Sequence, residues 1–534
     1  MNGMLSAPQP VAVEEGRKVL RAGGNAVDAA VATAFVQGVV DPQMAGVGGF
    51  GNLVMYRAAT REAVALDFYT RVPLAAKPDM FVNEIVGPSN WGGWQLEQFA
   101  NDIGYRSICT PGMVLGLHEA LTRFGTWRWH DVLQPAIQVA AAGVPVYHHV
   151  YDRWMRHTPG FADSYTRHTA TPEAARIYTK DGRMKEPGEI MDLADYARTL
   201  ELLANGGPDV MYRGGELGQR ILTDMAENGG LVRQDDLDAF RVVSGSPILG
   251  SYRGFTIHAP PPPGAGVLVV QALNVLEGFD LGSLEHNSAE HLHILGETLR
   301  LGFADWTQNI GDPAFVNNPI DWLTGAERAY ELRDAIRTGA RPPGREPAYE
   351  SPHTTHVSVI DREGNAVSLT HSLGLGSGVV TQGLGFMYND SMILFDPHPG
   401  GPNSIEPGKI RQHASSNCVL YRDGQPVLAV GAPGGHGIVS GVVQTISNIV
   451  DFGMTPLEAV SVGRIHCQGD VLLAEARITR EAVDELRRRG HEVRHSFYSY
   501  DYASGRVHAV GVDPATGRLR GGADPRAGGM ALPG

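Results

Sequence analysis

The sequence predicts an α+β fold, in which a mostly helical first part is followed by a strand-rich second part. Apolar residues recur at helical spacing in several segments before residue 338, whereas short alternating segments dominate from residue 354 onward. The chain has 534 residues and is 43% hydrophobic. This is enough for two ordinary domains, or for one large unit with a sizeable core, so the protein is globular.

The first elements are expected to be two helices, a glycine-rich loop and a strand. Residues 12–24, AVEEGRKVLRAGG, have helical spacing and end at paired glycines, and residues 25–40, NAVDAAVATAFVQGVV, continue with an alanine-rich helix. In residues 44–56, MAGVGGFGNLVMY, a glycine cluster leads into an alternating strand. A phosphate-binding glycine loop lies between a strand and a following helix, so this cluster is not expected to bind a nucleotide.

Residues 111 to about 287 are expected to be mostly helical. The segments PGMVLGLHEALTRFG, DLADYARTLELLANGG and GGELGQRILTDMAENGG all show i, i+3, i+4 apolar spacing and end at glycine. The segment RGFTIHAPPPPGAGVLVVQALNVLEGF predicts a strand, a stiff proline turn and a buried helix. Residues 338–351 then lack periodicity and are rich in proline, glycine and charge, which is typical of an exposed linker.

After this linker the sequence predicts strands. HVSVI and AVSLTHS form one expected hairpin, and NCVLYRDGQPVLAVGAPGG forms another around the turn RDGQ. EVRHSFYS and RVHAVGVDPATGRLRGG predict further strands near the C-terminus.

The first hairpin places two hydroxyl side chains opposite each other. If Asp361 and Asn365 flank the three-residue turn in DREGN, then residues whose numbers add up to 726 are paired across the strands. Thr354 then lies opposite Ser372, and a Thr–Ser pair across two strands can share a hydrogen bond. Both residues lie at the end of the hairpin, just after the expected linker.

A threonine hydroxyl becomes a useful nucleophile when a base lies beside it, and the α-amino group of an N-terminal threonine, with a pKa of about 8, can be that base. Thr354 would become N-terminal if its hydroxyl attacked the carbonyl of His353 and water cleaved the resulting ester. The chain would then consist of a large subunit, residues 1–353, and a small subunit, residues 354–534. The alternative is purely structural, because threonine is a good strand former.

Charge, cysteine content and hydropathy exclude several other classes of protein. The formal net charge is −14 and no basic stripe is present, so no nucleic-acid partner is expected. The three cysteines are widely spaced, so they predict neither a disulfide framework nor a Cys-x-x-Cys metal-binding motif. No apolar run is long enough to span a membrane and no secretion signal is evident, so a cytoplasmic location is expected. His353 and His356 point to opposite faces of a strand, so no metal or other cofactor is expected.

Several motifs along nearly the whole chain resemble the γ-glutamyltranspeptidases, a family of N-terminal nucleophile hydrolases. They are GGNAVDAAVA, GVGGFGNLVMY, PGMVLGLHEAL, LADYARTLE, DLDAFRVVSGSPILGSYRG, PPPPGAGV, TTHVSVIDREGNAVSLT, GAPGG and GGADPRAGG. The resemblance implies a four-layer αββα sandwich built from both parts of one autoprocessed precursor. It also implies that Thr354 is the nucleophile, that Ser372 assists it, and that Gly434 and Gly435 form an oxyanion hole.

The residues that hold a γ-glutamyl group in the family are largely replaced. In the family an arginine binds the α-carboxylate of the γ-glutamyl group; this sequence has Tyr69 at that position, and Arg71 follows two residues later. In the family an aspartate binds the α-amino group, and Leu394 stands at its position here. A glutamine and an asparagine of the family correspond to Ser391 and Gly374. The family's paired serines are represented only loosely, by His413, Ser415 and Ser416, and Arg411 and His371 are further groups that could meet an anion.

The resemblance therefore implies an amidohydrolase with a kept nucleophile and a changed acyl pocket. Its expected partners are a small-molecule amide other than glutathione and its own two subunits, with a possible homodimer of the processed pair. Oxamate amidohydrolases and cephalosporin-type acylases are branches of this kind. Two alternatives remain open: a glutathione hydrolase or γ-glutamyltransferase with relocated binding residues, and an unprocessed binding protein without catalysis.

Overall fold

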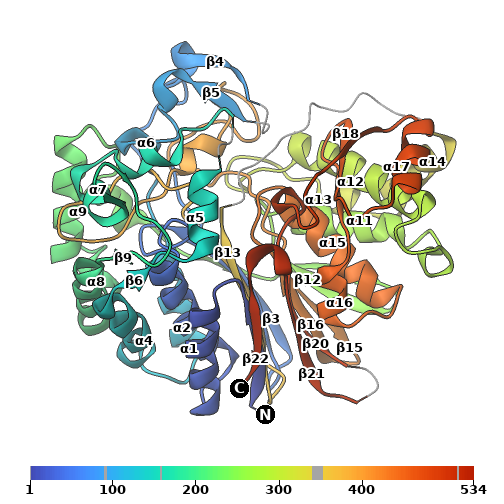
Figure 1. Cartoon of the computed structure of the whole chain (residues 1–534), viewed down its shortest axis with the longest axis horizontal. Helices are drawn as coiled ribbons and strands as arrows, with labels where there is room; N and C mark the ends of the chain where they lie inside the picture. The colour runs from blue at the N-terminus through green and yellow to red at the C-terminus, as the bar shows by residue number, and fades with distance from the viewer. Residues whose placement is uncertain (1, 90–92, 157–158, 340–352, 514–515) are drawn as a thin grey trace.

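The structure, a computed structural model, describes residues 2–89, 93–156, 159–339, 353–513 and 516–534. Two sheets run through the middle of the molecule, with helices on either side of them (Figure 1). The two ends of the chain lie side by side, and the N–H of Asn2 donates to the carbonyl of Gly534 at 3.1 Å. This mixture of helix and sheet agrees with the α+β prediction.

The larger sheet has seven strands among the described residues, and every neighbouring pair is antiparallel. In spatial order they are β10 (Val243–Gly245), β3 (Glu62–Asp67), β2 (Phe50–Arg57), β14 (Ala366–Ser372), β13 (Thr355–Asp361), β1 (Gly3–Ala7) and β22 (Met530–Pro533). The predicted hairpin β13–β14 therefore lies in the middle of this sheet. The strands β1 and β22, at the two ends of the chain, were not predicted.

The smaller sheet has six antiparallel strands in the described part of the chain. They are, in order, β11 (Ile248–Tyr252), β12 (Phe255–Ala259), β15 (Cys418–Arg422), β16 (Gln425–Gly431), β20 (His508–Val512) and β21 (Leu519–Ala523). Each sheet takes strands from both sides of Thr354. The segments before and after that residue are thus interleaved and do not form separate domains.

The two sheets pack face to face through apolar side chains. Met4, Val54 and Ile360 of the larger sheet belong to one buried cluster with Val419 and Val510 of the smaller sheet. Alternate residues of each strand point to this side, as the period of a β-strand requires. The helices therefore cover the opposite face of each sheet.

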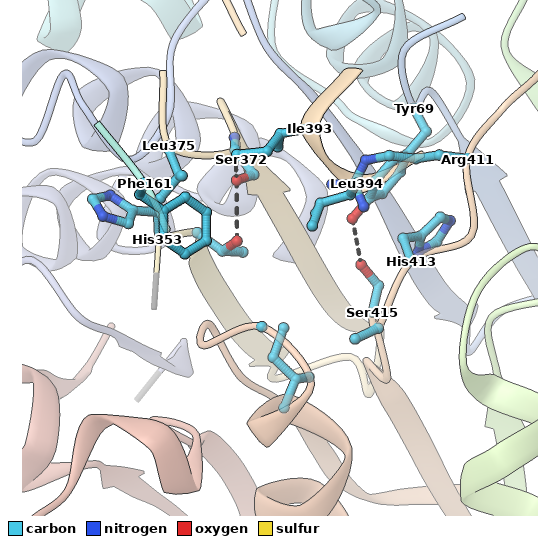
Figure 2. A pocket seen from close by; sticks show the side chains of 15 residues that line it. Tyr69, Phe161, His353, Ser372, Leu375, Ile393, Leu394, Arg411, His413 and Ser415 are labelled. Atoms are coloured by element: carbon cyan, nitrogen blue, oxygen red, sulfur yellow. Dashed lines mark hydrogen bonds between the residues drawn. The ribbon is translucent and has the colours of Figure 1, made fainter. Parts of the chain in front are cut away.

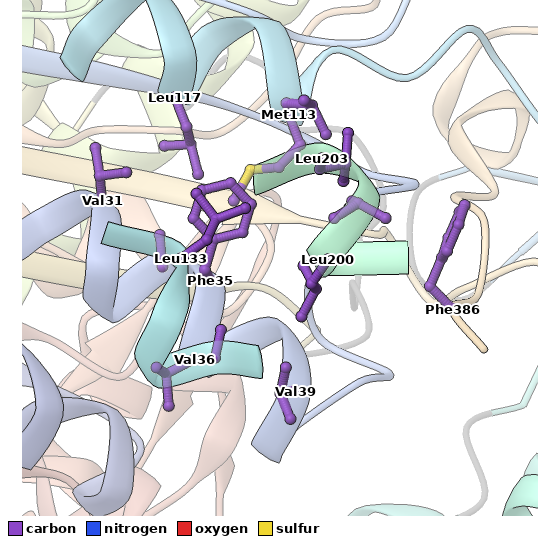
Figure 3. Close-up of a cluster of buried hydrophobic side chains, with 14 of the residues drawn as sticks. Val31, Phe35, Val36, Val39, Met113, Leu117, Leu133, Leu200, Leu203 and Phe386 are labelled. Carbon is purple, nitrogen blue, oxygen red and sulfur yellow. The ribbon is translucent and has the colours of Figure 1, made fainter. Parts of the chain in front are cut away.

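The helix α2 (Ala26–Val40) is the centre of the helical layer on the larger sheet, and all its residues are buried. Asn25 caps it, because its side chain accepts from the N–H groups of Val27 and Asp28. Figure 3 shows the side chains of this layer, with Phe35 of α2 beside Leu117 and Leu133. Its other helices are α1 (Pro10–Arg21), α3 (Met113–Phe124), α4 (Trp129–Ala142) and α8 (Ala194–Gly206).

The smaller sheet is covered by α11 (Gly266–Leu276), α12 (Ala289–Asn309), α15 (Gly437–Val450) and α16 (Pro456–Ser461). The predicted strand, proline turn and buried helix of residues 253–279 are confirmed as β12 followed by α11. The helix α15 begins just after the glycines of GAPGG. This helix start lies beside the hairpin end that carries Thr354, because Gly435 and Ile438 line the same pocket as Thr354.

The remaining elements lie around these layers. The further helices are α5 (His148–Met155), α6 (Ser164–His168), α7 (Pro172–Tyr178), α9 (Glu216–Glu227), α10 (Gln234–Ala239), α13 (Ile320–Leu323), α14 (Ala326–Thr338) and α17 (Arg480–Arg488). Short strands are β4 (Ile85–Pro88), β5 (Trp94–Leu96), β6 (Val144–Pro145), β7 (Thr179–Lys180), β8 (Arg183–Met184), β9 (Ile190–Met191), β17 (Ile465–His466), β18 (Val471–Ala474) and β19 (Glu492–His495). Most of the predicted linker lies outside the described residues. Among the helices that are described, none combines the length and apolar character that a membrane crossing requires.

Candidate active site

The predicted hairpin forms with the predicted register. Thr355 pairs with His371 and His356 with Thr370, so both pairs of numbers add up to 726. One position further, the hydroxyl oxygens of Thr354 and Ser372 are 3.0 Å apart and share a hydrogen bond (Figure 2). The Oγ of Ser372 also accepts from the N–H of Gly374 at 2.9 Å, which fixes its orientation. Ser372 can therefore donate its proton to Thr354 or accept the proton of Thr354.

A buried polar network under the hairpin holds Thr355 in place. The side-chain amide of Gln37, on α2, donates to the hydroxyl of Thr355 at 2.8 Å. The carbonyl oxygen of the same amide lies 2.8 Å from Nε2 of His371, and Thr355 donates to Gln9 at 3.0 Å. His371 thus bonds within the protein and does not line the pocket, contrary to its suggested contact with an anion. This network lets α2 position the strand end that carries Thr354.

The backbone at Thr354 is strained. Its φ angle is +143°, in a region that β-branched residues rarely adopt. The preceding side chain, His353, is half-buried, and its desolvation together with the nearby Arg153 and Arg167 lowers the pKa of His353 well below its usual value. Strained residues of this kind cluster at functional sites and cost of order 1–3 kcal/mol each. Here the strained residue is Thr354, which supplies the N atom of the His353–Thr354 peptide bond.

Gly434 and Gly435 form a turn between β16 and α15. Their φ angles are +131° and +58°, which suit glycine and few other residues. Within the described part of the chain, the N–H of neither glycine donates a hydrogen bond to the backbone. The partial positive charge of a helix N-terminus favours an anion at this place. Gly435 lines the same pocket as Thr354, so its N–H is available to stabilise negative charge there.

Thr354 and Ser372 open into a pocket that contains most of the predicted substrate-contact residues. Tyr69 and His413 stack, with ring centroids 3.6 Å apart, and the hydroxyl of Tyr69 lies 2.9 Å from Oγ of Ser415 (Figure 2). The predicted residues that line the pocket are Tyr69, Gly374, Leu394, Arg411, His413 and Ser415. The pocket thus combines a hydroxyl pair, a free peptide N–H and a mostly apolar wall, which is an arrangement suited to acyl transfer.

Comparison with known families identifies the chain. A family model described as gamma-glutamyltranspeptidase matches residues 12–534. The chain belongs to the γ-glutamyltranspeptidase family.

Relatives of this γ-glutamyltranspeptidase-family protein include acylases and glutathione hydrolases. It is 36% identical to the acylase ACY 1 proenzyme of Pseudomonas sp. (strain V22), over 99% of this chain and 93% of that protein. It is 32% identical to the glutathione hydrolase proenzyme of Escherichia coli (strain K12), over 98% of this chain and 90% of that protein. The crystal structure of a cephalosporin acylase from Bacillus halodurans matches with a TM-score of 0.87 and 27% identity, over 99% of this chain and 95% of that chain.

Three residues predicted to contact substrate in this family member do not line the pocket. Arg71 forms a β-bridge with Thr110, and its guanidinium instead donates to the carbonyl of Gly408 at 3.2 Å and lies over the ring of Phe240. Ser391 accepts a hydrogen bond from Thr70 at 2.8 Å. Ser416 donates to the carbonyl of Ala414 at 2.9 Å. The polar groups of these three side chains therefore form contacts with other parts of the protein.

Sequence reasoning missed five apolar residues of the pocket: Phe161, Leu375, Ile393, Ala414 and Ile438. Leu375 and Ile393 are neighbours of predicted positions, so adjacency in the sequence could have indicated them. Phe161 comes from the loop between α5 and α6, and no motif marks it. Phe161 reaches the pocket only because its loop folds against segments that are distant in the sequence, and a single sequence does not reveal such contacts.

Asp390 lies behind the pocket wall, and it was also missed. Its Oδ1 accepts from the N–H of Leu375 at 2.8 Å, and a side chain at Gly374 would come within 2.0 Å of that oxygen. Gly374 is therefore required by this close approach, whatever its effect on substrate. Burial raises the pKa of Asp390 to about 8, although Arg167, 3.6 Å away, opposes this shift.

The protonation of Asp390 makes stability depend on pH. Because its pKa is higher in the folded than in the unfolded chain, its contribution is fully present below about pH 4 and is lost as the pH rises through about 8. Asp390→Asn keeps the acceptor for Leu375 and removes the titration. We expect the melting temperature of this variant to gain a few degrees on the wild type between about pH 5 and about pH 9, measured by calorimetry. A difference that stays constant with pH would contradict a raised pKa.

The histidines and carboxylates do not assemble a metal site in the described ranges. No group of three or more His, Cys, Asp or Glu side chains within them could hold an ion. His356 bonds to Thr370 and Ser358 inside the larger sheet.

Proposed function

We propose that this protein is an N-terminal nucleophile amidohydrolase that cleaves its own chain before Thr354. The hydrogen-bonded hydroxyl pair of Thr354 and Ser372, at a strained strand end beside Gly435, is the observation that carries the proposal. The names of the relatives quoted above, an acylase proenzyme and a glutathione hydrolase proenzyme, support both the amide chemistry and the processing. The packing of two sheets between outer helices supports a four-layer αββα sandwich.

Self-cleavage would begin when Oγ of Thr354 attacks the carbonyl carbon of His353. The C–N bond between the two residues breaks, an ester forms, and the amine of Thr354 is released. Water then hydrolyses the ester to the carboxylate of His353 and the free hydroxyl. The products are residues 1–353 and residues 354–534, and they would remain together because their strands alternate in both sheets.

Hydrolysis of a substrate would follow the same route with the new amine as the base. The α-amino group of Thr354 takes the hydroxyl proton while Oγ attacks the amide carbon, and it then protonates the leaving amine. The resulting acyl ester on Thr354 is hydrolysed by water. The N–H of Gly435, and that of Gly434 in the same turn, would stabilise the oxyanion of each tetrahedral intermediate.

The substrate that we propose is a small or acyl amide other than glutathione, for example an oxamate-like amide. Tyr69, Leu394 and Ile393 give the pocket an apolar wall where a zwitterionic γ-glutamyl group would need charged partners. The 32% identical glutathione hydrolase favours the second candidate, a γ-glutamyl hydrolase or transferase. The two candidates share the nucleophile and differ only in the acyl group.

Trapping of the acyl-enzyme tests this proposal. The protein is mixed rapidly with acyl p-nitroanilides, quenched in acid and analysed by mass spectrometry. We expect the mass of one acyl group on the fragment that begins at Thr354, together with release of p-nitroaniline. Release of p-nitroaniline with the acyl group attached elsewhere, or no release from any neutral, anionic or γ-glutamyl anilide, would refute the proposal.

A further inference from the structure

Three arginines lie together at the C-terminal end of α10, outside the pocket that contains Thr354. Nη1 of Arg213 donates to the carbonyl oxygen of Asp238 at 2.5 Å, and Nη1 of Arg241 donates to the same oxygen at 2.5 Å. These two nitrogens are therefore no more than about 5 Å apart. Arg71 joins them, because its Nη2 donates to the carbonyl of Arg241 at 3.4 Å.

Little negative charge opposes this arginine cluster. Among the described residues, the one carboxylate within salt-bridge distance of it belongs to Asp238, whose Oδ1 lies 3.9 Å from Nη1 of Arg213. That oxygen also accepts from the side-chain amide of Gln234 at 3.1 Å. Arg176, in contrast, lies 2.6 Å from Glu173. The cluster therefore has a net positive charge, although the formal net charge of the chain is −14.

The two exposed guanidinium groups of the cluster have a free edge each. Arg213 donates from Nη1 to the carbonyls of Leu237 and Asp238. Arg241 donates from Nη1 to those of Asp238 and Phe240. In the part of the chain that the structure describes, Nε and Nη2 of both side chains have no hydrogen-bond partner. This Nε–Nη2 edge can donate two parallel hydrogen bonds to one anion.

The cluster suits an anion with more than two oxygen atoms. Like charges this close repel each other, so an anion between the guanidinium groups stabilises them. One arginine edge occupies both oxygens of a carboxylate, whereas the four oxygens of a phosphate can accept from two arginines at once. The bonds from Nη1 to the backbone hold both side chains in place before binding, which limits the loss of conformational entropy.

We propose that Arg213 and Arg241 bind a phosphate dianion, carried by free phosphate or by a phosphate monoester, and that Arg71 adds to the positive potential. The site is separate from the pocket, so this inference does not depend on the proposed amide hydrolysis. It does not require chain cleavage either. Thr354→Ala should therefore bind phosphate as the wild type does.

Calorimetric titration with inorganic phosphate at constant ionic strength tests the site. We expect saturable binding to the wild type. Kd should weaken about 10-fold in Arg213→Gln and in Arg241→Gln, the usual effect of losing a charge-assisted hydrogen bond, and the double variant should not bind. Acetate has two oxygens and one charge, and should bind about 10-fold more weakly than phosphate or worse.

Three further variants show whether the effect belongs to these guanidinium groups. Arg213→Lys and Arg241→Lys keep the charge without the planar edge, and should bind phosphate more tightly than the matching Gln variants but more weakly than the wild type. Arg128→Gln removes an arginine whose side chain is 82% exposed and should change nothing. A cooperative melting transition without phosphate shows that each variant is folded.

Phenyl phosphate distinguishes the two sources of the anion. Binding as tight as that of free phosphate would assign the site to phosphoryl groups on larger molecules, and binding of free phosphate alone would assign it to the free ion. Both results support the site. Equal phosphate binding by the wild type and the double Gln variant, acetate binding as tight as phosphate binding, or no saturable binding of either phosphate compound would overturn the proposal.

Discussion

Replacement of the Thr354 hydroxyl is expected to abolish both chain cleavage and amide hydrolysis. In Thr354→Ala the nucleophilic oxygen is absent, so neither the ester with His353 nor the acyl-enzyme can form. Removal of the nucleophile in enzymes of this type lowers kcat by about 10⁴-fold or more, and we expect a decrease of this size. The gel pattern under denaturing conditions and the rate of anilide hydrolysis measure the two effects.

Thr354→Ser is the matched control for this experiment. Serine keeps the Oγ atom and the hydrogen bond to Ser372, at 3.0 Å in the wild type, and lacks only the methyl group. Chain cleavage and part of the activity should therefore remain. Hydrolysis by Thr354→Ala at a rate close to that of the wild type would show that another residue is the nucleophile.

The second large effect is expected at Ser372, which touches the nucleophile without forming a covalent bond. Ser372→Ala removes the partner of the Thr354 hydroxyl and leaves the N–H of Gly374 without its acceptor. A lost hydrogen bond and an unpaired buried donor together are worth about 1–3 kcal/mol, which corresponds to roughly 10- to 100-fold in rate. We expect cleavage of the chain and hydrolysis of anilides to slow by this factor.

Ser372→Thr separates the role of the hydroxyl from that of the fold. Threonine keeps the Oγ atom on a strand position that suits a β-branched residue, so both rates should stay near those of the wild type. The melting temperature of each variant is measured alongside, because a merely structural defect lowers stability without a selective loss of rate. Wild-type rates in a folded Ser372→Ala would rule out assistance by this residue.

The central hairpin could be predicted because residues close together in the sequence determine its turn and its register. The turn DREGN sets the register, and the register alone brings Thr354 opposite Ser372. Helix ends were equally local: paired glycines follow α1, and Asn25 caps α2. In contrast, β1 and β22 pair with each other from opposite ends of the chain. Such long-range pairing leaves no signal in either short segment.

The pocket was predicted only in part, for a related reason. Tyr69, Leu394 and His413 were found through the motifs that surround them, and the structure brings them together. Arg71 was predicted to contact substrate but does not line the pocket, because it bridges to Thr110 and stacks on Phe240, and these contacts depend on distant segments.

Intact-mass analysis of freshly purified protein tests the central claim most directly. We predict two polypeptides, residues 1–353 and 354–534, that elute together under native conditions, with Thr354 as the first residue of the smaller one by N-terminal sequencing. Thr354→Ala should give one chain in the same measurement. A wild-type protein that remains a single 57.3 kDa chain, or one that is cut at a different bond, would contradict the assignment of Thr354 as an N-terminal nucleophile.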